Sequence, residues 1–326
     1  MKTPDFFQLH RIDDAALATE AAAGLQAPAA RVSPKFLYDP LGSRLFDAIT
    51  ELAEYYPTRT EAAIFSTHGP AIAAAALAAA GPRPMLVDLG AGNCAKAARL
   101  FGLLDPRRYV AVDISVDFLR QALQQLQREH PSLALVGVGL DFSSQLALPA
   151  ALADGPALVF YPGSSIGNFA PDAALQLLRQ AREVAAGGAL LIGVDLVKPT
   201  ALLEAAYDDD LGVTAAFNLN LLKHLNNLLG ADFDVRAWRH VALFNSAASR
   251  IEMHLEARHA QTVRWPGGER HFAAGERLHT ENSYKWTAPA FAGLLHAAGF
   301  AEVQHWTDQA GWFGVFVATV RTSRPG

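Results

Sequence analysis

The stretch MLVDLGAGN, Met85 to Asn93, decides the fold of this chain. Its first six residues form a largely apolar run typical of a buried strand, and the segment NCAKAARLFGLL, which starts at Asn93, has the spacing of a helix. Glycines at a strand-to-helix turn let the backbone approach a ligand, and the N-terminus of a helix offers unpaired amides. The stretch therefore predicts a strand, a glycine loop and a helix, with a nucleotide-like ligand at the loop.

The same alternation of apolar runs and helical segments continues along the chain. We expect parallel strands at residues 85–90, 109–113, 133–142, 157–163 and 189–197, separated by helices. Near the C-terminus, a helix over PAFAGLLHAAGF precedes two further strands, EVQHWTD and GWFGVFVATV, which can rejoin the same sheet. This order predicts the α/β class, with a doubly wound, Rossmann-like sheet.

A different pattern lies between Lys198 and Trp286, where a helical segment at 213–229 is followed by the strand-like runs VALF and IEMHLEAR. We interpret this part as an insertion that folds with the N-terminal residues into a second, smaller α+β domain. The predicted sheet domain comprises residues 57–198 and 287–326, and the smaller domain comprises residues 1–56 and 199–286.

Composition and charge exclude several classes of protein. The chain has 326 residues, 51% of them hydrophobic, so it is not a disordered chain, and its net charge of −5 argues against a nucleic-acid partner. Its longest strictly apolar run, Ala71–Ala80, is ten residues, below the roughly 18 that a membrane span requires. The start of the chain lacks the uninterrupted apolar core of a signal peptide, and the single cysteine forbids an internal disulfide. We expect a cytoplasmic protein with no membrane partner; the sequence leaves its oligomeric state open, and a monomer is plausible.

Acidic residues at two strand ends narrow the choice of cofactor. Asp113 ends the second strand, where its carboxylate can accept both hydrogen bonds from a ribose diol. The dinucleotide fingerprint would place its third glycine at Ala95, so S-adenosylmethionine, which has a diol but no phosphates, fits better. Asp141 and Phe142 follow the third strand and suit the amine and the face of an adenine ring. The alternative is that Gly90 and Gly92 only make a tight turn and Asp113 only caps the next helix.

Cysteine and histidine offer two other chemistries. Cys94 follows the glycine loop at a helix start, a setting that can lower the pKa of a thiol, but no histidine partner is identifiable and we expect a packed bystander. His254 and His259 would point to opposite faces of a strand, and Arg258 stands where a helical zinc motif needs its second histidine. We therefore predict no metal site.

Five blocks outside the glycine loop resemble the L-histidine Nα-methyltransferase family of ergothioneine biosynthesis, and the resemblance covers nearly the whole chain. The blocks are PKFLYDPLGSRLFDAITELAEYYPTRTE (34–61), GSSIGNF (163–169), AYDDDLGVTAAFNLNLLKHLN, IEMHL and TENSYKW. The resemblance implies a class I methyltransferase fold that binds S-adenosylmethionine in the sheet domain and the substrate in the smaller one. It also implies three methyl transfers to the α-amino group of L-histidine, which give hercynine and S-adenosylhomocysteine.

Roles for individual residues follow from the same resemblance. Tyr56, Asn168 and Tyr207 match residues that hold the carboxylate and α-amino group of histidine, and Glu281 and Ser283 match the pair that grips its imidazole. The other implied substrate residues are Tyr38, near the reacting amine and the candidate catalytic residue, together with Phe46, Gly163, Phe217 and Met253. The implied cofactor residues are Gly90, Gly92, Lys96, Asp113, Asp141 and Phe142. Without the resemblance, Tyr56 and Met253 would be assigned to packing and Glu281 to the solvated surface.

Methyl transfer from a sulfonium needs a neutral amine in line with the methyl group, so positioning should dominate the rate. We assign no obligatory general base, because free α-amino groups titrate near about 8. Tyr38 is the best candidate to orient the amine or pass its proton on. Two alternatives stay open: a methyltransferase of the same fold that acts on another small amine or amino acid, and an NAD(P)-dependent oxidoreductase.

Overall fold

The computed structural model describes residues 2–9, 13–143 and 145–320. The chain forms two compact units. Unit 1 comprises Met1–Arg11, Pro57–Val197 and Trp286–Gly326, and unit 2 comprises Ile12–Tyr56 and Lys198–Lys285. Each unit is described by itself below.

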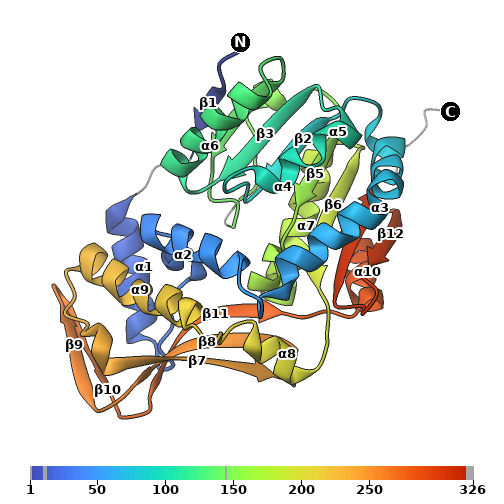
Figure 1. The fold of residues 1–326 in the computed structure, drawn as a ribbon. Helices are drawn as coiled ribbons and strands as arrows, with labels where there is room; N and C mark the ends of the chain where they lie inside the picture. The colour runs from blue at the N-terminus through green and yellow to red at the C-terminus, as the bar shows by residue number, and fades with distance from the viewer. Residues whose placement is uncertain (1, 10–12, 144, 321–326) are drawn as a thin grey trace. The chain divides into compact units, whose positions relative to one another are not determined.

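Unit 1 is built on one mixed sheet whose strand order is β1-β4-β3-β2-β5-β6-β13-β12 (Figure 1). Strands β1 to β6 are parallel, and β13 and β12 are antiparallel to their neighbours. The strands are β1 (Asp5–Gln8), β2 (Met85–Leu89), β3 (Arg108–Asp113), β4 (Ala134–Gly139), β5 (Ala157–Tyr161), β6 (Ala189–Asp195), β12 (Glu302–Thr307) and β13 (Phe313–Thr319). The five predicted parallel strands and the two C-terminal strands that rejoin the sheet are confirmed.

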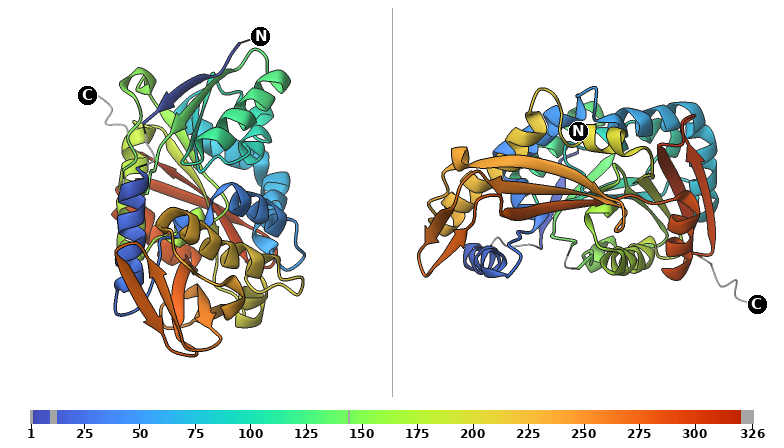
Figure 2. Two further views of the ribbon diagram at one scale, coloured as in Figure 1. Left: turned by 90° about the vertical axis from the view of Figure 1, so that its left-hand side faces the viewer. Right: turned by 90° about the horizontal axis from the view of Figure 1, so that it is seen from below.

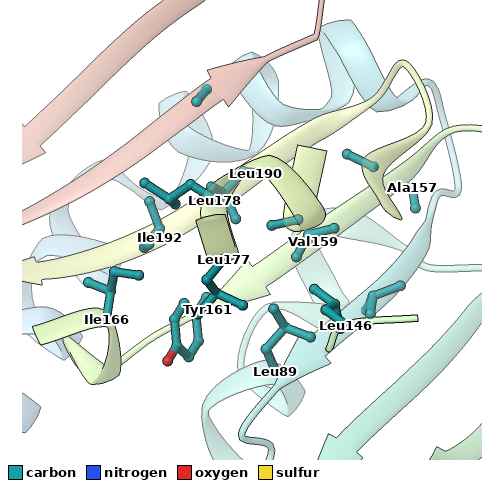
Figure 3. Packing of buried hydrophobic residues seen from close by; sticks show 14 of the residues in the cluster. Leu89, Leu146, Ala157, Val159, Tyr161, Ile166, Leu177, Leu178, Leu190 and Ile192 are labelled. Atoms are coloured by element: carbon teal, nitrogen blue, oxygen red, sulfur yellow. The ribbon is translucent and has the colours of Figure 1, made fainter. Parts of the chain in front are cut away.

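Helices cover both faces of this sheet. They are α3 (Tyr56–Ala80), α4 (Ala95–Ala98), α5 (Phe101–Leu104), α6 (Val116–Glu129), α7 (Pro171–Ala185) and α10 (Ala288–Ala297), with short 3-10 turns η2 (Ala150–Leu152) and η3 (Ser165–Asn168). On one face, Leu177 and Leu178 of α7 pack against Val159, Leu190 and Ile192 of the central strands (Figure 3). The single helix predicted after the glycine loop is instead two short helices, α4 and α5, although its apolar side chains are buried as expected.

The N-terminal strand differs from the sequence interpretation, which placed all of residues 1–56 in the smaller domain. Strand β1 pairs with β4 at the edge of the unit 1 sheet, and Phe6 lies opposite Gly137. A Cβ at Gly137 would come within 2.4 Å of the Phe6 ring, so the glycine leaves the space that this ring fills. The guanidinium of Arg120 in α6 lies over the Phe6 ring, 3.7 Å from its centre.

Helix α3 is the only helix among the described residues that is long and apolar enough to cross a membrane by length and composition. Its side chains Ile64, Ile72 and Ala76 are buried in the core that also contains Leu86 of β2. The core helix of a soluble domain passes the same test, and these contacts make α3 a partly buried core helix rather than a membrane span.

Unit 2 contains a three-stranded antiparallel sheet of order β11-β8-β7 and a separate β9-β10 hairpin (Figure 2). The strands are β7 (Trp238–Asn245), β8 (Arg250–Ala257), β9 (Gln261–Trp265), β10 (Gly268–Phe272) and β11 (Arg277–Tyr284). The helices are α1 (Asp14–Gln26), α2 (Pro40–Thr50), α8 (Thr200–Ala205) and α9 (Val213–Leu229), with 3-10 turns η1 (Pro34–Leu37) and η4 (Val235–Ala237). Helix α9 is confirmed at its predicted bounds, whereas the sequence interpretation missed β9, β10 and β11.

Candidate active site

The glycine loop of unit 1 follows β2 and is held by the strand beside it. Gly90 and Gly92 both have positive φ, 69° and 52°, a conformation that side chains with a Cβ rarely adopt. The carboxylate of Asp113 accepts hydrogen bonds from the N–H of Gly92 at 2.9 Å and of Ser115 at 2.8 Å. Asp113 therefore does join the loop to the start of α6, as the alternative interpretation required. These bonds hold Asp113 at the loop, and its contact with ribose hydroxyls stays a prediction.

Two aromatic rings lie next to this loop. A Cβ at Gly90 would come within 3.8 Å of the Phe142 ring, so Phe142 is in van der Waals range of the loop. The Phe142 ring meets the Tyr161 ring edge-on, with centroids 5.8 Å apart. The Tyr161 hydroxyl is buried and has no hydrogen-bond partner among the described residues. Asp141 precedes Phe142 and accepts a hydrogen bond from the N–H of Ser143.

A buried carboxylate from α3 connects two predicted site residues. Glu61, whose side chain is 3% exposed, accepts a hydrogen bond from the Lys96 ammonium at 2.8 Å. Its other oxygen accepts from the N–H of Gly163 at 2.8 Å, in the loop after β5. Gly163 has a φ of 76°, and a Cβ there would lie 2.8 Å from the Lys96 Nζ atom. Lys96 and Gly163 are therefore adjacent, although the sequence interpretation assigned one to the cofactor and the other to the substrate.

Burial raises the pKa of two further ionisable groups near the glycine loop, those of Asp88 and Cys94. Burial raises the pKa of Asp88 to about 7, although a 2.6 Å hydrogen bond from the Tyr109 hydroxyl opposes this shift. Burial also raises the pKa of the Cys94 thiol to about 12. A thiol that stays protonated is a poor nucleophile, so the lowered pKa considered for this helix start is excluded and Cys94 is a packed bystander.

In unit 2, the predicted residues Tyr207 and Ser283 share a closed triangle of hydrogen bonds with Lys285. The Tyr207 hydroxyl donates to the Ser283 Oγ at 2.7 Å. The Lys285 ammonium donates to the Ser283 Oγ at 2.7 Å and to the Tyr207 Oη at 3.0 Å. Ser283 and Lys285 are 4% and 3% exposed, so this triangle is buried. The structure thus brings together one residue predicted for the amino-acid backbone and one predicted for the imidazole.

A second buried lysine contacts Tyr56, the first residue of α3. The Lys198 ammonium donates to the Tyr56 hydroxyl at 2.8 Å and lies 4.4 Å from the centre of its ring. Tyr56 is 2% exposed. A cation near a phenol oxygen polarises its O–H bond, which strengthens the hydroxyl as a donor toward a carboxylate.

The aromatic residues of the N-terminal block form one cluster with α9. Tyr38 follows η1, and its ring meets those of Phe46 in α2 and Phe217 in α9 edge-on, at 5.7 Å and 5.5 Å. Tyr55 continues the cluster, because its ring lies 6.2 Å from both Phe46 and Tyr207. Three predicted substrate residues, Tyr38, Phe46 and Phe217, are therefore mutual neighbours.

Strand register pairs the last two predicted substrate residues. Met253 of β8 lies directly opposite Glu281 of β11, next to an irregularity in the pairing between His279 and Glu281. Met253 is 1% exposed and Glu281 6%, so Glu281 is not the solvated surface charge that its polar neighbours indicate. Ser283 follows two positions later on the strand and so faces the same side of the sheet as Glu281.

The histidines of this sheet do not form a metal site. The ring of His254 meets that of His279 edge-on at 5.1 Å, and Glu252 accepts a 3.2 Å contact from His254. Burial lowers the pKa of both histidines. Within the described ranges, no group of three or more His, Cys, Asp or Glu side chains is arranged to hold a metal ion.

Each unit therefore gathers one set of the predicted residues. Unit 1 contains all six predicted cofactor residues together with Gly163 and Asn168, the last residue of η3, and unit 2 contains the other eight predicted substrate residues. The sequence analysis did not single out Glu61, Lys198 or Lys285. Glu61 and Lys285 do lie in two of the five quoted blocks, which was the available signal.

Comparison with known proteins decides the family. The family of histidine-specific, S-adenosylmethionine-dependent methyltransferases matches residues 17–320. The chain belongs to this family. Histidine N-alpha-methyltransferase from Mycolicibacterium smegmatis is 42% identical over 311 residues, which are 93% of this chain and 94% of that relative. The relative of the same name from Mycobacterium tuberculosis is 41% identical, with the same shares covered. Ergothioneine biosynthesis protein 1 from Neurospora crassa is 29% identical over 83% of this chain and 31% of that protein.

As a histidine-specific methyltransferase, the chain uses S-adenosylmethionine as its methyl donor. The alternative of an NAD(P)-dependent oxidoreductase is therefore wrong, as the missing third glycine at Ala95 already indicated. The predicted class I methyltransferase fold agrees with the parallel core of unit 1 and its two antiparallel C-terminal strands.

Proposed function

We propose that this chain transfers methyl groups from S-adenosylmethionine to the α-amino group of L-histidine, three times in succession, to give hercynine for ergothioneine biosynthesis. The names of the two mycobacterial relatives and of the fungal relative support this reaction and this pathway. The observation that carries the proposal is the buried strand β11 in unit 2. It presents a carboxylate at Glu281 and a hydroxyl at Ser283 on one face, and Tyr207 is hydrogen-bonded to that hydroxyl.

The cofactor residues fit S-adenosylmethionine. The Asp113 carboxylate suits the ribose diol, and Phe142 with Asp141 suits the adenine ring. The orphaned Tyr161 hydroxyl beside Phe142 also suits a polar ligand. At the methionine end of the cofactor, Lys96 suits the carboxylate. The loop glycines, which have positive φ and no side chain, let the protein backbone come close to this part of the cofactor. When bound, the cofactor supplies an electrophilic methyl group on its sulfonium.

The substrate residues fit a zwitterionic amino acid with a polar ring. We assign the carboxylate and α-amino group of histidine to Tyr56, Asn168 and Tyr207, which offer neutral donors and acceptors. We assign the imidazole to Glu281 and Ser283, because a carboxylate beside a hydroxyl matches two ring nitrogens of which one or both carry a proton. The apolar walls are assigned to Phe46, Gly163, Phe217 and Met253.

The residues of the site act mainly by positioning. The α-amino group needs its lone pair for attack, and its pKa of about 8 makes the neutral form accessible near neutral pH. Tyr38 is assigned to orient this amine and to pass its proton toward water. The edge-on packing of Tyr38 against Phe46 and Phe217 limits the rotation of its ring, which supports this orienting role.

We also propose a cytoplasmic location, with L-histidine as the small-molecule substrate and with neither a nucleic-acid nor a membrane partner. The single cysteine, Cys94, is buried, which suits a reducing compartment. Net charge of −5 does not favour nucleic acid or an anionic membrane surface.

One experiment tests the reaction. The protein is incubated with S-adenosylmethionine and, separately, each of the twenty common amino acids, and products are read by mass. We expect histidine alone to gain methyl groups, up to three, all on the α-amino nitrogen. Methylation of another amino acid in preference to histidine, or of a ring nitrogen, would overturn the proposal. A single Glu281→Ala variant serves as the control, because it should keep S-adenosylhomocysteine binding while losing activity on histidine.

A further inference from the structure

Hydrogen bonds of its backbone, as well as those of its side chain, fix Lys285 in place. Its backbone N–H donates to the carbonyl of Ser249 at 2.7 Å, and its own carbonyl accepts from the Ser249 hydroxyl at 2.8 Å. Ser249 lies in the turn between β7 and β8. The ammonium group therefore enters the triangle with Ser283 and Tyr207 from a rigid support.

The hydrogen atoms of this triangle can be counted. A serine hydroxyl has one hydrogen to donate and two lone pairs that accept. At Ser283 both lone pairs are occupied, one by the Tyr207 hydroxyl and one by the Lys285 ammonium. An ammonium group can only donate, so Lys285 never returns a lone pair to Ser283. With Tyr207 as the donor in its bond to Ser283, the Ser283 hydrogen has no acceptor in the part of unit 2 that the structure describes, and it is available to a ligand.

We propose that Lys285 is a positioning residue that fixes Ser283 as a hydrogen-bond donor and thereby makes the site select substrates with a neutral imidazole ring. The inference rests on the proposed contact of Glu281 and Ser283 with the imidazole. A neutral imidazole has one N–H, which the Glu281 carboxylate accepts, and one bare nitrogen, which accepts from Ser283. A protonated imidazolium has two N–H groups, and one of them would face the Ser283 O–H with no lone pair to receive it.

Without Lys285, Glu281 and Ser283 would together prefer the protonated imidazolium over the neutral imidazole. Glu281 carries a carboxylate that attracts an imidazolium, and a Ser283 with a vacant lone pair would accept its second N–H. Lys285 therefore decides which ionisation state of the ring is bound. Three further titratable residues contact Tyr207. The Tyr55 ring lies 6.2 Å from the Tyr207 ring, the His240 ring of β7 bonds the Tyr207 carbonyl, and the backbone carbonyl of Glu204 in α8 accepts from the Tyr207 N–H.

The test is calorimetric titration with ligand at pH 7.0 and pH 5.5, with S-adenosylhomocysteine saturating. With a side-chain pKa near 6.5, about three quarters of histidine rings are neutral at the higher pH and about a tenth at the lower pH. The affinity of the parent protein for histidine should therefore fall about eightfold on acidification. The 1,2,4-triazole analogue of histidine, whose ring stays neutral, is the control for titration of the protein, and its affinity should change less than twofold, roughly.

Variants separate the role of Lys285 from general damage. In K285M the affinity for histidine should fall less than about threefold between pH 7.0 and pH 5.5. K285R keeps a charged donor and should retain the eightfold fall. K223M is the matched control, because Lys223 is an exposed lysine on α9 and its loss should leave the eightfold fall intact. If K285M does not fold, Y207F is the substitute, because it frees the other lone pair of Ser283. Since Tyr207 is also assigned to the histidine backbone, Y207F should bind histidine more weakly at both pH values, and only the ratio of the two affinities is compared; that ratio should fall below about threefold.

The possible results are distinct. The role of Lys285 would be overturned if acidification lowered the affinity for histidine equally in the parent and in K285M. It would also be overturned if the affinity of the parent did not fall at pH 5.5. Failure of the proposed substrate site looks different, since S283A and E281A would then bind histidine at pH 7.0 as well as the parent does.

Discussion

Removing the Glu61 carboxylate should weaken both the fold of unit 1 and its affinity for the cofactor. Glu61→Ala leaves the Gly163 N–H without its acceptor, and an unsatisfied buried amide costs about 1–3 kcal/mol. It also removes the partner of Lys96, whose side chain is 37% exposed, so this loss is discounted to about 1 kcal/mol. The free energy of unfolding should therefore fall by about 2–4 kcal/mol.

Cofactor affinity should respond through the same two contacts. In the variant, Lys96 is no longer held against Glu61 and the Gly163 turn loses its anchor, so both must be ordered when ligand binds. Ordering a long side chain costs about 0.5–1.5 kcal/mol, and the turn adds to this, so affinity for S-adenosylhomocysteine should fall roughly tenfold. Glu61→Gln should lie between parent and Glu61→Ala, because its amide oxygen still accepts from Gly163 while its NH₂ group faces the ammonium.

Urea unfolding and calorimetric titration with S-adenosylhomocysteine measure the two effects. The matched control is Asp154→Ala, which removes contacts of 2.8 Å and 3.1 Å to Arg107 and Arg108. Those partners are substantially exposed, so the control should cost less than about 1 kcal/mol and leave affinity unchanged. A Glu61→Ala protein as stable as the control, or one that binds the cofactor product like the parent, would refute the assigned role of Glu61.

Three further predictions concern single sites. Asp113→Ala should weaken S-adenosylhomocysteine binding by about 1.5–3 kcal/mol, the range for hydrogen bonds to a charged group, and unchanged affinity by calorimetry would contradict the ribose assignment. Because the pKa of Asp88 is raised to about 7 in the fold, the folded state binds more protons than the unfolded state between about pH 4 and 7. Stability should then fall as pH rises by up to about 1.4 kcal/mol per unit, and urea unfolding of Asp88→Asn should lack this component. The double variant Glu281→Ala/Met253→Val removes the buried carboxylate that needs a polar partner and enlarges the pocket, so methylation of tryptophan relative to histidine should rise. The two amino acids are offered in competition and the products are counted by mass. An unaltered ratio of the two products would place both residues outside the ring pocket.

Sequence periodicity was sufficient to predict a helix or strand wherever that element buries a regular apolar face. The strands from Met85 to Asp195 and helix α9 have strong local patterns, and all of them form as predicted. Strand β11 has the sequence RLHTENSY, whose polar residues on both faces give no such pattern. It is fixed instead by its pairing with β8, and the register shift near Thr280 interrupts even the alternation that pairing would impose.

Tertiary partners that are distant in sequence explain the remaining differences. Strand β1 joins the large sheet because Gly137 leaves room for the Phe6 ring, a fit between residues that no local window contains. Glu61 acquires its role from Gly163, 102 residues away, and Lys285 from Tyr207, 78 residues away. In a sequence both read as ordinary surface charges, because burial and partner are properties of the folded chain.

The two units use buried charges in the same physical way. Glu61 and Lys285 are both almost fully buried, and each makes two hydrogen bonds to groups that are assigned to ligand binding. Burying a charge is unfavourable unless its hydrogen bonds are satisfied, so each charge constrains its neighbours to one geometry and one donor or acceptor state. That constraint suits a reaction in which the leaving group is already activated and the nucleophile titrates near neutral pH. In the proposed reaction the protein must add the orientation of a neutral amine and the choice of ring form, and buried charges held at fixed positions are suited to both tasks.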